Sequence, residues 1–175
     1  RKLLHEDQRW RDLALLIERD LAALEAEHAA ESDPQAMVAE ILELAVLTRE
    51  HLNDKDKAAE LLHRALSIDP TNEDALARYV EHFRERRDFR GLADLYEFSL
   101  ENARDAGATT AELIRRLEEI AQICELRLGD VPRALDTWRR IEELEPGSPK
   151  AREAVRRLSA RAKMWEQLVA VLDGE

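Results

Sequence analysis

The residues of this sequence that could do chemistry are five histidines, one cysteine and several adjacent pairs of carboxylates. Two histidines three or four positions apart on one helix can hold a metal ion, but the five here never recur at that spacing. They are His5, His28, His51, His63 and His82. The cysteine, Cys124, falls in an apolar helical stripe with Leu117 and Leu128, which predicts a buried and unreactive thiol.

The acidic pairs Glu118-Glu119 and Glu142-Glu143 would need burial to act as a general acid and base, and nothing in their surroundings implies it. The sequence contains no glycine-rich phosphate loop, no Gly-x-Ser-x-Gly and no His-Glu-x-x-His. We therefore expect a protein that is not an enzyme, with no catalytic residue, no bound metal and no cofactor.

The amino-acid composition predicts the type of secondary structure that carries these residues. Charged residues make up 37% of the 175 residues, aromatic residues 5%, and glycine and proline number five each. So few glycines and prolines cannot supply the turns of a β-sandwich or of alternating strands and helices. The abundant Ala, Leu, Glu and Arg are strong helix formers, so the chain is predicted to be all-α.

The charge balance narrows the class of partner. A formal net charge of −11 argues against a general binder of nucleic-acid backbones, which needs a net basic face. The charge is uneven, because residues 1–70 carry nine Lys and Arg against sixteen Asp and Glu, whereas residues 147–175 carry six against four. No stretch approaches eighteen uncharged apolar residues, so we expect no membrane insertion and a cytoplasmic location.

The chain is an internal repeat, since the sequence of residues 41–70 can be laid on that of residues 117–146. This alignment, called the repeat register below, pairs Leu44 with Ile120, Ala45 with Ala121, Ala58 with Ala134, and Leu62 with Trp138. The same register brings Phe89 onto Trp165, and a slightly longer step back along the chain brings Phe89 onto Trp10. Each repeat therefore holds two helical hairpins of about 38 residues.

Capping residues predict the helix boundaries. Thr109 with Glu112 has the pattern of a capping box, and Asn72 can cap the helix that follows it. Asn53 and Gly129 stand where a helix must reverse, and both tolerate the left-handed conformation. The expected helices are 7–28, 34–52, 54–68, 72–86, 88–105, 110–128, 130–144, 148–161 and 163–173.

Two segments resemble the second helix of a tetratricopeptide repeat. That family has a Gly-Asp turn, a small residue, a large apolar residue four positions later, an alanine three later and a proline five after that. In the first segment these spacings are met by Ala58, Leu62, Ala65 and Pro70. In the second they are met by Gly129-Asp130, Ala134, Trp138, Ile141 and Pro146, with Ile141 in place of the small residue. The predicted first helices match the family less well.

The resemblance implies a right-handed solenoid of stacked antiparallel helical hairpins, with about nine helices in a single repeat domain. The hairpins would cover approximately 1–28, 34–70, 72–105, 110–146 and 148–173. Such repeats are stabilised by stacking on their neighbours, and their ends need polar caps. Because neither end of the chain has such a cap, we expect part of a longer bacterial array whose uncapped ends could self-associate.

The resemblance also implies that first helices line a concave groove, acidic near the N-terminus and basic near the C-terminus. The predicted groove residues of the N-terminal half are Glu40, Glu43, Leu47, Glu50, His51, Asp74, Ala77, Glu81, Arg84 and Glu85. Those of the C-terminal half are Arg116, Glu119, Ile123, Leu126, Arg127, Lys150, Glu153, Arg157 and Arg161. Family members that bind chaperone carboxylates use Lys and Asn at points that are Glu43, Leu47, Ala77 and Glu81 here, so that activity is not expected.

The function predicted from the resemblance is a non-catalytic protein–protein scaffold that binds a peptide or helix of a partner. The alternative is a targeting or regulatory array of a larger enzyme whose catalytic domain lies outside this sequence. An RNA-processing repeat is disfavoured, because the chain is acidic and no aromatic residues interleave a basic face. The alternative for the groove is a set of ordinary solvent-exposed helix faces.

Overall fold

The computed structural model describes residues 9–27 and 34–172 of the chain, with side chains for residues 9–24 and 34–163. Every regular element in these ranges is helical, which confirms the all-α prediction. The chain divides into two compact units, Arg1–Arg86 and Arg87–Glu175, and each is described by itself. The extent of the predicted single domain stays a prediction.

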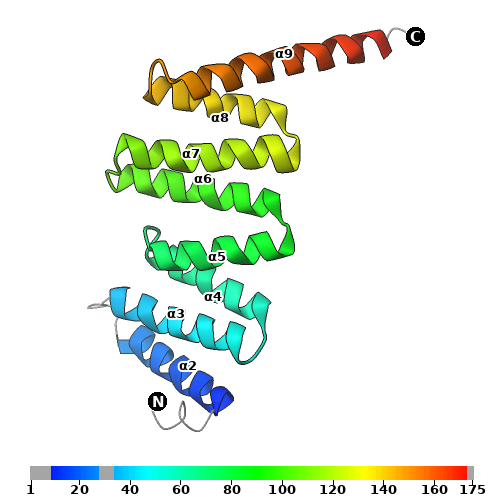
Figure 1. The fold of residues 1–175 in the computed structure, drawn as a ribbon. Coiled ribbons are helices and arrows are strands. Elements are labelled where there is room, and N and C mark those ends of the chain that lie inside the picture. The colour runs from blue at the N-terminus through cyan, green and yellow to red at the C-terminus, as the bar shows by residue number, and fades with distance from the viewer. Residues whose placement is uncertain (1–8, 28–33, 173–175) are drawn as a thin grey trace. The chain divides into compact units, whose positions relative to one another are not determined.

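Unit 1 contains four described helices, each packed against the next one along the chain (Figure 1). They are α2 (Trp10–Glu27), α3 (Pro34–Glu50), α4 (Lys55–Ile68) and α5 (Glu73–Arg86). Helix α4 begins at Asp54, whose side chain accepts a hydrogen bond from the Lys57 backbone N–H at 3.0 Å. The predicted cap Asn72 accepts from the Ala75 N–H at 2.9 Å and starts α5.

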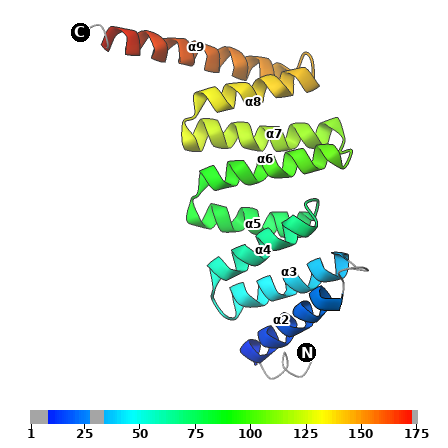
Figure 2. The same cartoon turned by 180° about the vertical axis from the view of Figure 1, so that it is seen from behind.

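Unit 2 repeats this arrangement with α6 (Phe89–Asp105), α7 (Thr110–Ile123), α8 (Val131–Leu144) and α9 (Pro149–Leu172). Consecutive helices of this unit lie side by side in both views (Figure 2). The predicted capping box is present, since Thr109 and Glu112 exchange hydrogen bonds at the start of α7. Asp88 caps α6 and Asp130 caps α8 in the same way as Asp54 caps α4.

The turn between α3 and α4 and the turn between η1 and α8 have the same geometry, and the repeat register pairs their residues. Asn53 and Gly129 both adopt the predicted left-handed conformation, with φ of 55° and 67°. The backbone N–H of Asp54 donates to the Thr48 carbonyl at 3.1 Å, and that of Asp130 donates to the Cys124 carbonyl at 2.9 Å. The repeat found in the sequence is therefore a repeat of backbone hydrogen bonding.

The helix predicted at 110–128 is in fact two segments. An α-helix ends at Ile123, and a single π-helical turn, η1 (Cys124–Leu128), completes it. A π turn closes its hydrogen bonds over one more residue than an α turn, which is difficult to predict from propensity. This turn contacts α6, α7 and α8. Cys124 is fully buried within it, which confirms the prediction of a buried thiol.

The C-terminal prediction of separate helices at 148–161 and 163–173 is wrong, because α9 runs unbroken from Pro149 to Leu172. The earlier turn before Phe89 depends on Arg87 in the left-handed conformation and on the Asp88 cap. The repeat register places Met164 opposite Asp88, and a methionine has no side-chain oxygen with which to cap a new helix. The chain therefore continues as helix.

Each unit has its own helix–helix core, built from the residues that the repeat pairs. Ala58 and Ala134, which hold the small-residue position of the repeat, are both buried, and a larger side chain there would overpack the core. Leu62 and Trp138 are buried at equivalent positions one turn further along each helix. These elements fix the faces of α3 and α5 in unit 1, and of α7 and α9 in unit 2, that carry the candidate site residues.

Candidate functional site

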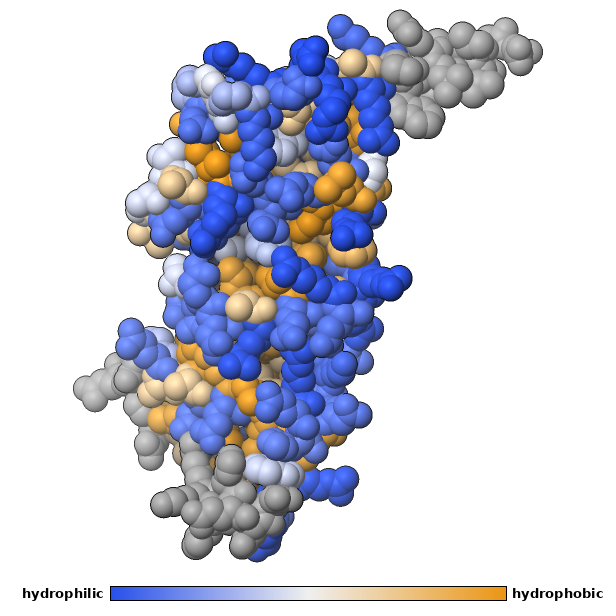
Figure 3. Space-filling model, viewed as in Figure 1, coloured by the Kyte–Doolittle hydropathy of each residue, from blue (hydrophilic) through white to orange (hydrophobic). Residues whose placement is uncertain are grey.

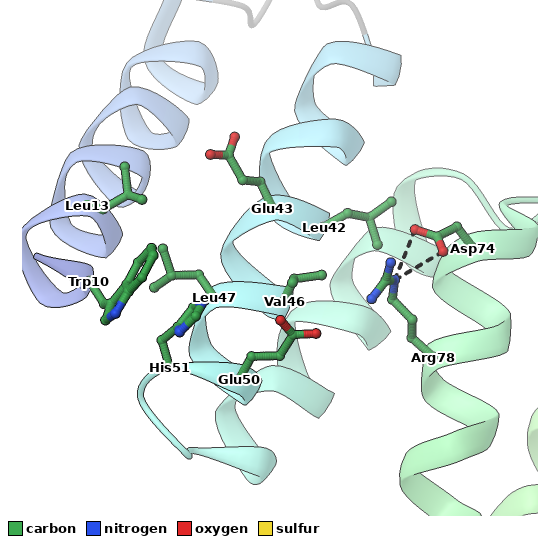
Figure 4. Close-up of a pocket in the computed structure, with 10 residues that line it drawn as sticks. All are labelled: Trp10, Leu13, Leu42, Glu43, Val46, Leu47, Glu50, His51, Asp74 and Arg78. Carbon is green, nitrogen blue, oxygen red and sulfur yellow. Dashed lines mark hydrogen bonds and ion pairs between the residues drawn. The ribbon is translucent and has the colours of Figure 1, made fainter. Parts of the chain in front are cut away.

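Unit 1 contains a pocket of about 360 Å³ between α2, α3 and α5 (Figure 4). Its apolar lining comes from Leu13 and Leu47, which are buried, and from Leu42 and Val46, which are half-buried. Half of its ten lining residues are apolar or aromatic and half are charged or polar, so the pocket offers both an apolar contact surface and charged groups. The remaining lining residues are Trp10, Glu43, Glu50, His51, Asp74 and Arg78.

An aromatic stack forms one wall of this pocket. The rings of Trp10 and His51 are parallel to within 8°, with centroids 3.7 Å apart. Figure 4 shows the two rings beside Leu47, at the end of the pocket where α2 begins and α3 ends. Stacking of this kind is favourable, so the two rings stabilise each other as one flat wall.

The rim of the pocket is mainly acidic. Glu43 and Glu50 are exposed on α3, and Glu50 forms no ion pair with the side chains that the structure describes. On α5, the Nε of Arg78 donates to both carboxylate oxygens of Asp74, at 3.1 and 3.0 Å. The one cation of the lining is therefore already paired, and the net charge of the pocket is negative.

The structure brings five of the predicted groove residues of unit 1 together in this pocket: Glu43, Leu47, Glu50, His51 and Asp74. The other five do not line it. Glu81 and Glu85 bind Arg49 of α3 at 3.2 and 2.7 Å, and Glu85 also accepts from Lys55 at 3.0 Å. Glu40 is half-buried, and Ala77 and Arg84 are exposed.

The equivalent positions of unit 2 form a related arrangement with a different chemistry. The repeat register pairs His51 with Arg127, whose guanidinium carbon lies 5.2 Å from the centroid of the Phe89 ring. Phe89 is in turn the residue that the sequence comparison matches with Trp10. A stacked pair of aromatic rings in unit 1 is thus matched by a cation–π pair in unit 2.

The ion pairs between first helices are also matched, with their charges reversed. Arg49 of α3 binds Glu81 of α5, whereas the equivalent pair in unit 2 is Glu125 with Arg157 of α9. Five repeat-equivalent positions are reversed in this way. They are Glu40 and Arg116, Arg49 and Glu125, Asp74 and Lys150, Glu81 and Arg157, and Glu85 and Arg161.

A second class of ion pair is repeated with its charges kept. The Nζ of Lys57 on α4 lies 2.6 Å from a carboxylate oxygen of Glu18 on α2. In unit 2 a similar ion pair joins Arg133 of α8, which the repeat register pairs with Lys57, to Asp94 of α6, with the two atoms 2.9 Å apart. The reversal therefore applies to the first-helix face and not to this face of the second helices.

The predicted groove residues of unit 2 lie on α7, η1 and α9. Arg116 donates to the Ser99 hydroxyl at 3.0 Å, and Lys150 pairs with Glu118 at 2.7 Å. Ile123 is buried, whereas Leu126 is 70% exposed. Arg127, Glu153 and Arg161 are exposed, and Glu119 is half-buried.

The titration of two buried or paired groups follows from these contacts. The hydrogen bond from Arg157 lowers the pKa of Glu125 below its ordinary value, and the charges of Arg157 and Arg161 act in the same direction. Burial raises the pKa of the Cys124 thiol, so this cysteine is not activated as a nucleophile. Glu125 therefore stays ionised under ordinary conditions and holds Arg157.

Sequence reasoning missed part of the pocket. Leu13, Leu42, Val46 and Arg78 are not among the predicted groove residues, and Trp10 enters the sequence analysis only through its repeat match with Phe89. The repeat contains a clue to the aromatic wall. In each unit an aromatic residue at the start of a helix (Trp10 or Phe89) is accompanied by a residue that can stack on it (His51 or Arg127) at a matched position.

The absence of a catalytic residue, a metal and a cofactor stays a prediction, which the described residues do not test. No group of three or more His, Cys, Asp and Glu among them is placed to hold a metal ion. His5 and His28 lie outside the described residues. None of the described helices combines the length and the apolar composition needed to cross a membrane.

Comparison with known proteins shows the fold. The N-terminal domain of stress-induced protein-1 (STI-1) from C. elegans matches with a TM-score of 0.53 and 16% identity, over 74% of this chain and 99% of that one. BtubC from P. vanneervenii matches at 0.46 and 19%, over 99% and 78% of the two chains. TPR-like repeats of a putative kinesin light chain from Podosopora anserina match at 0.47 and 12%, over 99% and 88%.

No family model and no curated protein matches the sequence. The helices, their caps and the structural match together show a tetratricopeptide-like helical-repeat fold, as the sequence resemblance implied. At 16% identity this similarity concerns the fold alone.

Proposed function

We propose that this chain is a non-catalytic protein-interaction scaffold, and that the pocket of unit 1 seats a peptide or helix of a partner protein. The observation that carries the proposal is the pocket itself, which combines an apolar lining, a stacked aromatic wall and an acidic rim. A tetratricopeptide-like framework supports the proposal by presenting helix faces on a rigid scaffold.

The chemistry of the pocket favours a bulky apolar side chain flanked by lysine or arginine. Leu42, Val46 and Leu47 offer apolar contact area, which supplies affinity when water is displaced. Glu43 and Glu50 on the rim attract a basic neighbour, and such complementary charges act mainly on association rate and orientation. A basic partner segment at this site agrees with the predicted groove, which is acidic near the N-terminus of the chain.

The proposal is tested with a displayed library of random 16-residue peptides selected on the immobilised full chain. Selected peptides are expected to contain a large apolar residue beside Lys or Arg. Their affinity should fall about tenfold in the Glu43→Lys/Glu50→Lys variant, because each exposed pair is worth about 0–1 kcal/mol. The association rate should fall more than the dissociation rate rises, and salt should weaken binding to the unchanged chain only.

The matched control is Glu60→Lys/Glu101→Lys, which makes the same change in net charge at exposed positions outside the pocket. Binding to this control should stay within twofold of the unchanged chain. If the selected peptides bind the pocket variant and the control equally, the pocket is not the partner site.

A further inference from the structure

A second surface, at the end of α7 in unit 2, presents apolar side chains that the fold leaves open. Leu126 is 70% exposed and Leu128 is 36% exposed, and both belong to the π turn η1. Figure 3 shows exposed apolar surface on the part of unit 2 where α7 ends. Isolated exposed leucines are ordinary, but here two of them flank a positively charged residue, Arg127.

Arg127 is held in place without being neutralised. Its guanidinium lies over the Phe89 ring, at 5.2 Å from the centroid, and no carboxylate among the described residues binds it. A guanidinium uses its face to stack on a ring and keeps the N–H groups of its edge for hydrogen bonds. The stacked Arg127 is therefore a preoriented donor for a carboxylate from another molecule.

Helix α9 adds further positive charge beside this turn. Arg157 binds Glu125, the residue next to Leu126, with Nη2 to Oε2 at 3.0 Å. Arg161, one helical turn further on, is exposed and close enough to help lower the pKa of Glu125. Glu125 compensates Arg157, whereas neither Arg127 nor Arg161 forms an ion pair with a carboxylate that the structure describes.

A comparison with unit 1 supports an acidic partner for unit 2, because the matched positions of the two units differ in charge. At six equivalent positions unit 1 has five carboxylates and a histidine, namely Glu43, Glu50, His51, Asp74, Glu81 and Glu85. Unit 2 has Glu119, Leu126, Arg127, Lys150, Arg157 and Arg161, which are one carboxylate, one leucine and four cations. An acidic partner segment is favoured at the second set and repelled at the first.

From the exposed Leu126, the stacked Arg127 and the neighbouring Arg161, we infer a second docking surface on unit 2. Its occupant is a segment of a partner protein in which a bulky apolar residue is flanked by Asp or Glu. The apolar residue covers Leu126 and Leu128, and the carboxylates receive hydrogen bonds from the two arginines. This inference does not depend on the pocket of unit 1, which prefers the opposite charge.

The experiment uses the full chain and a displayed library of random 16-residue peptides, scored for acidic sequences. A synthetic copy of an enriched acidic peptide is then titrated against Arg127→Glu/Arg161→Glu and against Leu126→Ser. We expect affinity to fall tenfold or more in the first variant and at least threefold in the second. A peptide of equal charge with its apolar residues replaced by serine should bind at least tenfold more weakly than its parent.

The matched control for the charge change is Arg104→Glu/Arg139→Glu, at exposed positions of unit 2 away from η1. It should bind the acidic peptide within twofold of the unchanged chain. The Glu43→Lys/Glu50→Lys variant should also bind it at least as tightly, which separates this surface from the unit 1 pocket. Methyl NMR provides the position, because the Leu126 signals should shift on binding while those of Leu15, 63% exposed in unit 1, stay unchanged.

Three results would overturn the inference. The first is a selection that yields no acidic apolar peptide, and the second is binding that is indifferent to Leu126→Ser and to the arginine variant. The third is a concentration-dependent association of the chain in sedimentation velocity that Leu126→Ser abolishes. That last result would identify a second copy of the chain as the occupant of the surface.

Discussion

Units 1 and 2 share a framework and differ in what they display on it. The small residues at close helix crossings, the left-handed turns after α3 and η1 and the aspartate caps of α4 and α8 recur in the repeat register. The first-helix faces, in contrast, reverse their charge at five positions. Close packing restricts the first group of residues, whereas an exposed charge has little influence on whether the helix forms.

The two units also contain two kinds of ion pair, one that keeps its polarity from unit to unit and one that reverses it. Lys57–Glu18 and Arg133–Asp94 keep their polarity on the second helices, so they can serve the same purpose in each unit. Arg49–Glu81 and Glu125–Arg157 join first helices with opposite polarity in the two units. Pairing between neighbouring helices therefore needs opposite charges, but it does not decide which helix carries which charge.

The largest expected difference between the units is in their cores, at Trp138 and its counterpart Leu62. Both side chains are buried, and truncation to alanine leaves a cavity. We expect Trp138→Ala to cost about 4–5 kcal/mol of unfolding free energy, and Leu62→Ala less, about 2–3 kcal/mol, because leucine is the smaller side chain. Urea denaturation followed by circular dichroism measures both, with exposed Arg139→Ala as a control that should stay within about 0.5 kcal/mol.

If Leu62→Ala proved more destabilising than Trp138→Ala, the expectation that the larger buried side chain contributes more would be wrong. Trp138→Leu, which places the unit 1 side chain in unit 2, should have an intermediate effect. An effect of Trp138→Leu as large as that of Trp138→Ala would show that the α8 crossing has its own shape and does not repeat that of α4.

A smaller difference is expected between the ion pairs of the first helices. The Glu125 side chain is only 9% exposed, whereas that of Glu81 is 61% exposed. Removing the charge with Glu125→Gln should cost about 1–2 kcal/mol, and Glu81→Gln should cost less than about 1 kcal/mol. A double-mutant cycle with Arg157→Gln isolates the pair, and no coupling in that cycle would contradict its structural role.

The same pair predicts a dependence of stability on pH. The folded-state pKa of Glu125 lies below its unfolded value, so the pair stabilises the fold above about pH 4.5 and loses this contribution as the pH falls through the folded-state pKa. The stability lost in Glu125→Gln should therefore be smaller at about pH 3 than at pH 7. An equal loss at both pH values would mean that the charge of Glu125 is not what stabilises the contact.

The smallest expected difference concerns the two turns. Gly129→Ala should cost about 1 kcal/mol, because an alanine at a φ of 67° is strained even though no atom lies near its added Cβ. Asn53→Ala at a φ of 55° should cost less, since asparagine already bears part of that strain. Thermal unfolding of the two variants side by side gives the order, and the reverse order would mean that the Asn53 side chain contributes a bond of its own.

The sequence predicted the fold well because capping and repetition are local properties. Thr109 with Glu112, and the left-handed Asn53 and Gly129, needed only the identity of neighbouring residues. The continuous α9 was not predicted, because the repeat pattern suggested a helix boundary near residue 162 although Met164 cannot cap a new helix. The π turn at Cys124 was missed because its hydrogen bonds depend on the packing of three helices.

The candidate site was only partly predictable, for a related reason. Helical spacing placed Glu43, Leu47 and Glu50 on one face of α3, and the structure places them in one pocket. It did not place Arg78 in the pocket, although Asp74 and Arg78 stand four residues apart on α5, a spacing that favours an ion pair. Nor could it show that Trp10 would stack on His51, since the two residues lie on different helices.

The reversed polarity of the first-helix ion pairs has a consequence for how the chain finds its native register. Hairpins this similar could stack on the wrong partner during folding, a known hazard of repeat proteins. A slip that put α9 in the position of α5 next to α3 would set Arg157 against Arg49, and one that put α5 in the position of α9 next to η1 would set Glu81 against Glu125. Like charges would meet in both misfolded pairings, so the reversal marks each helix for its own neighbour.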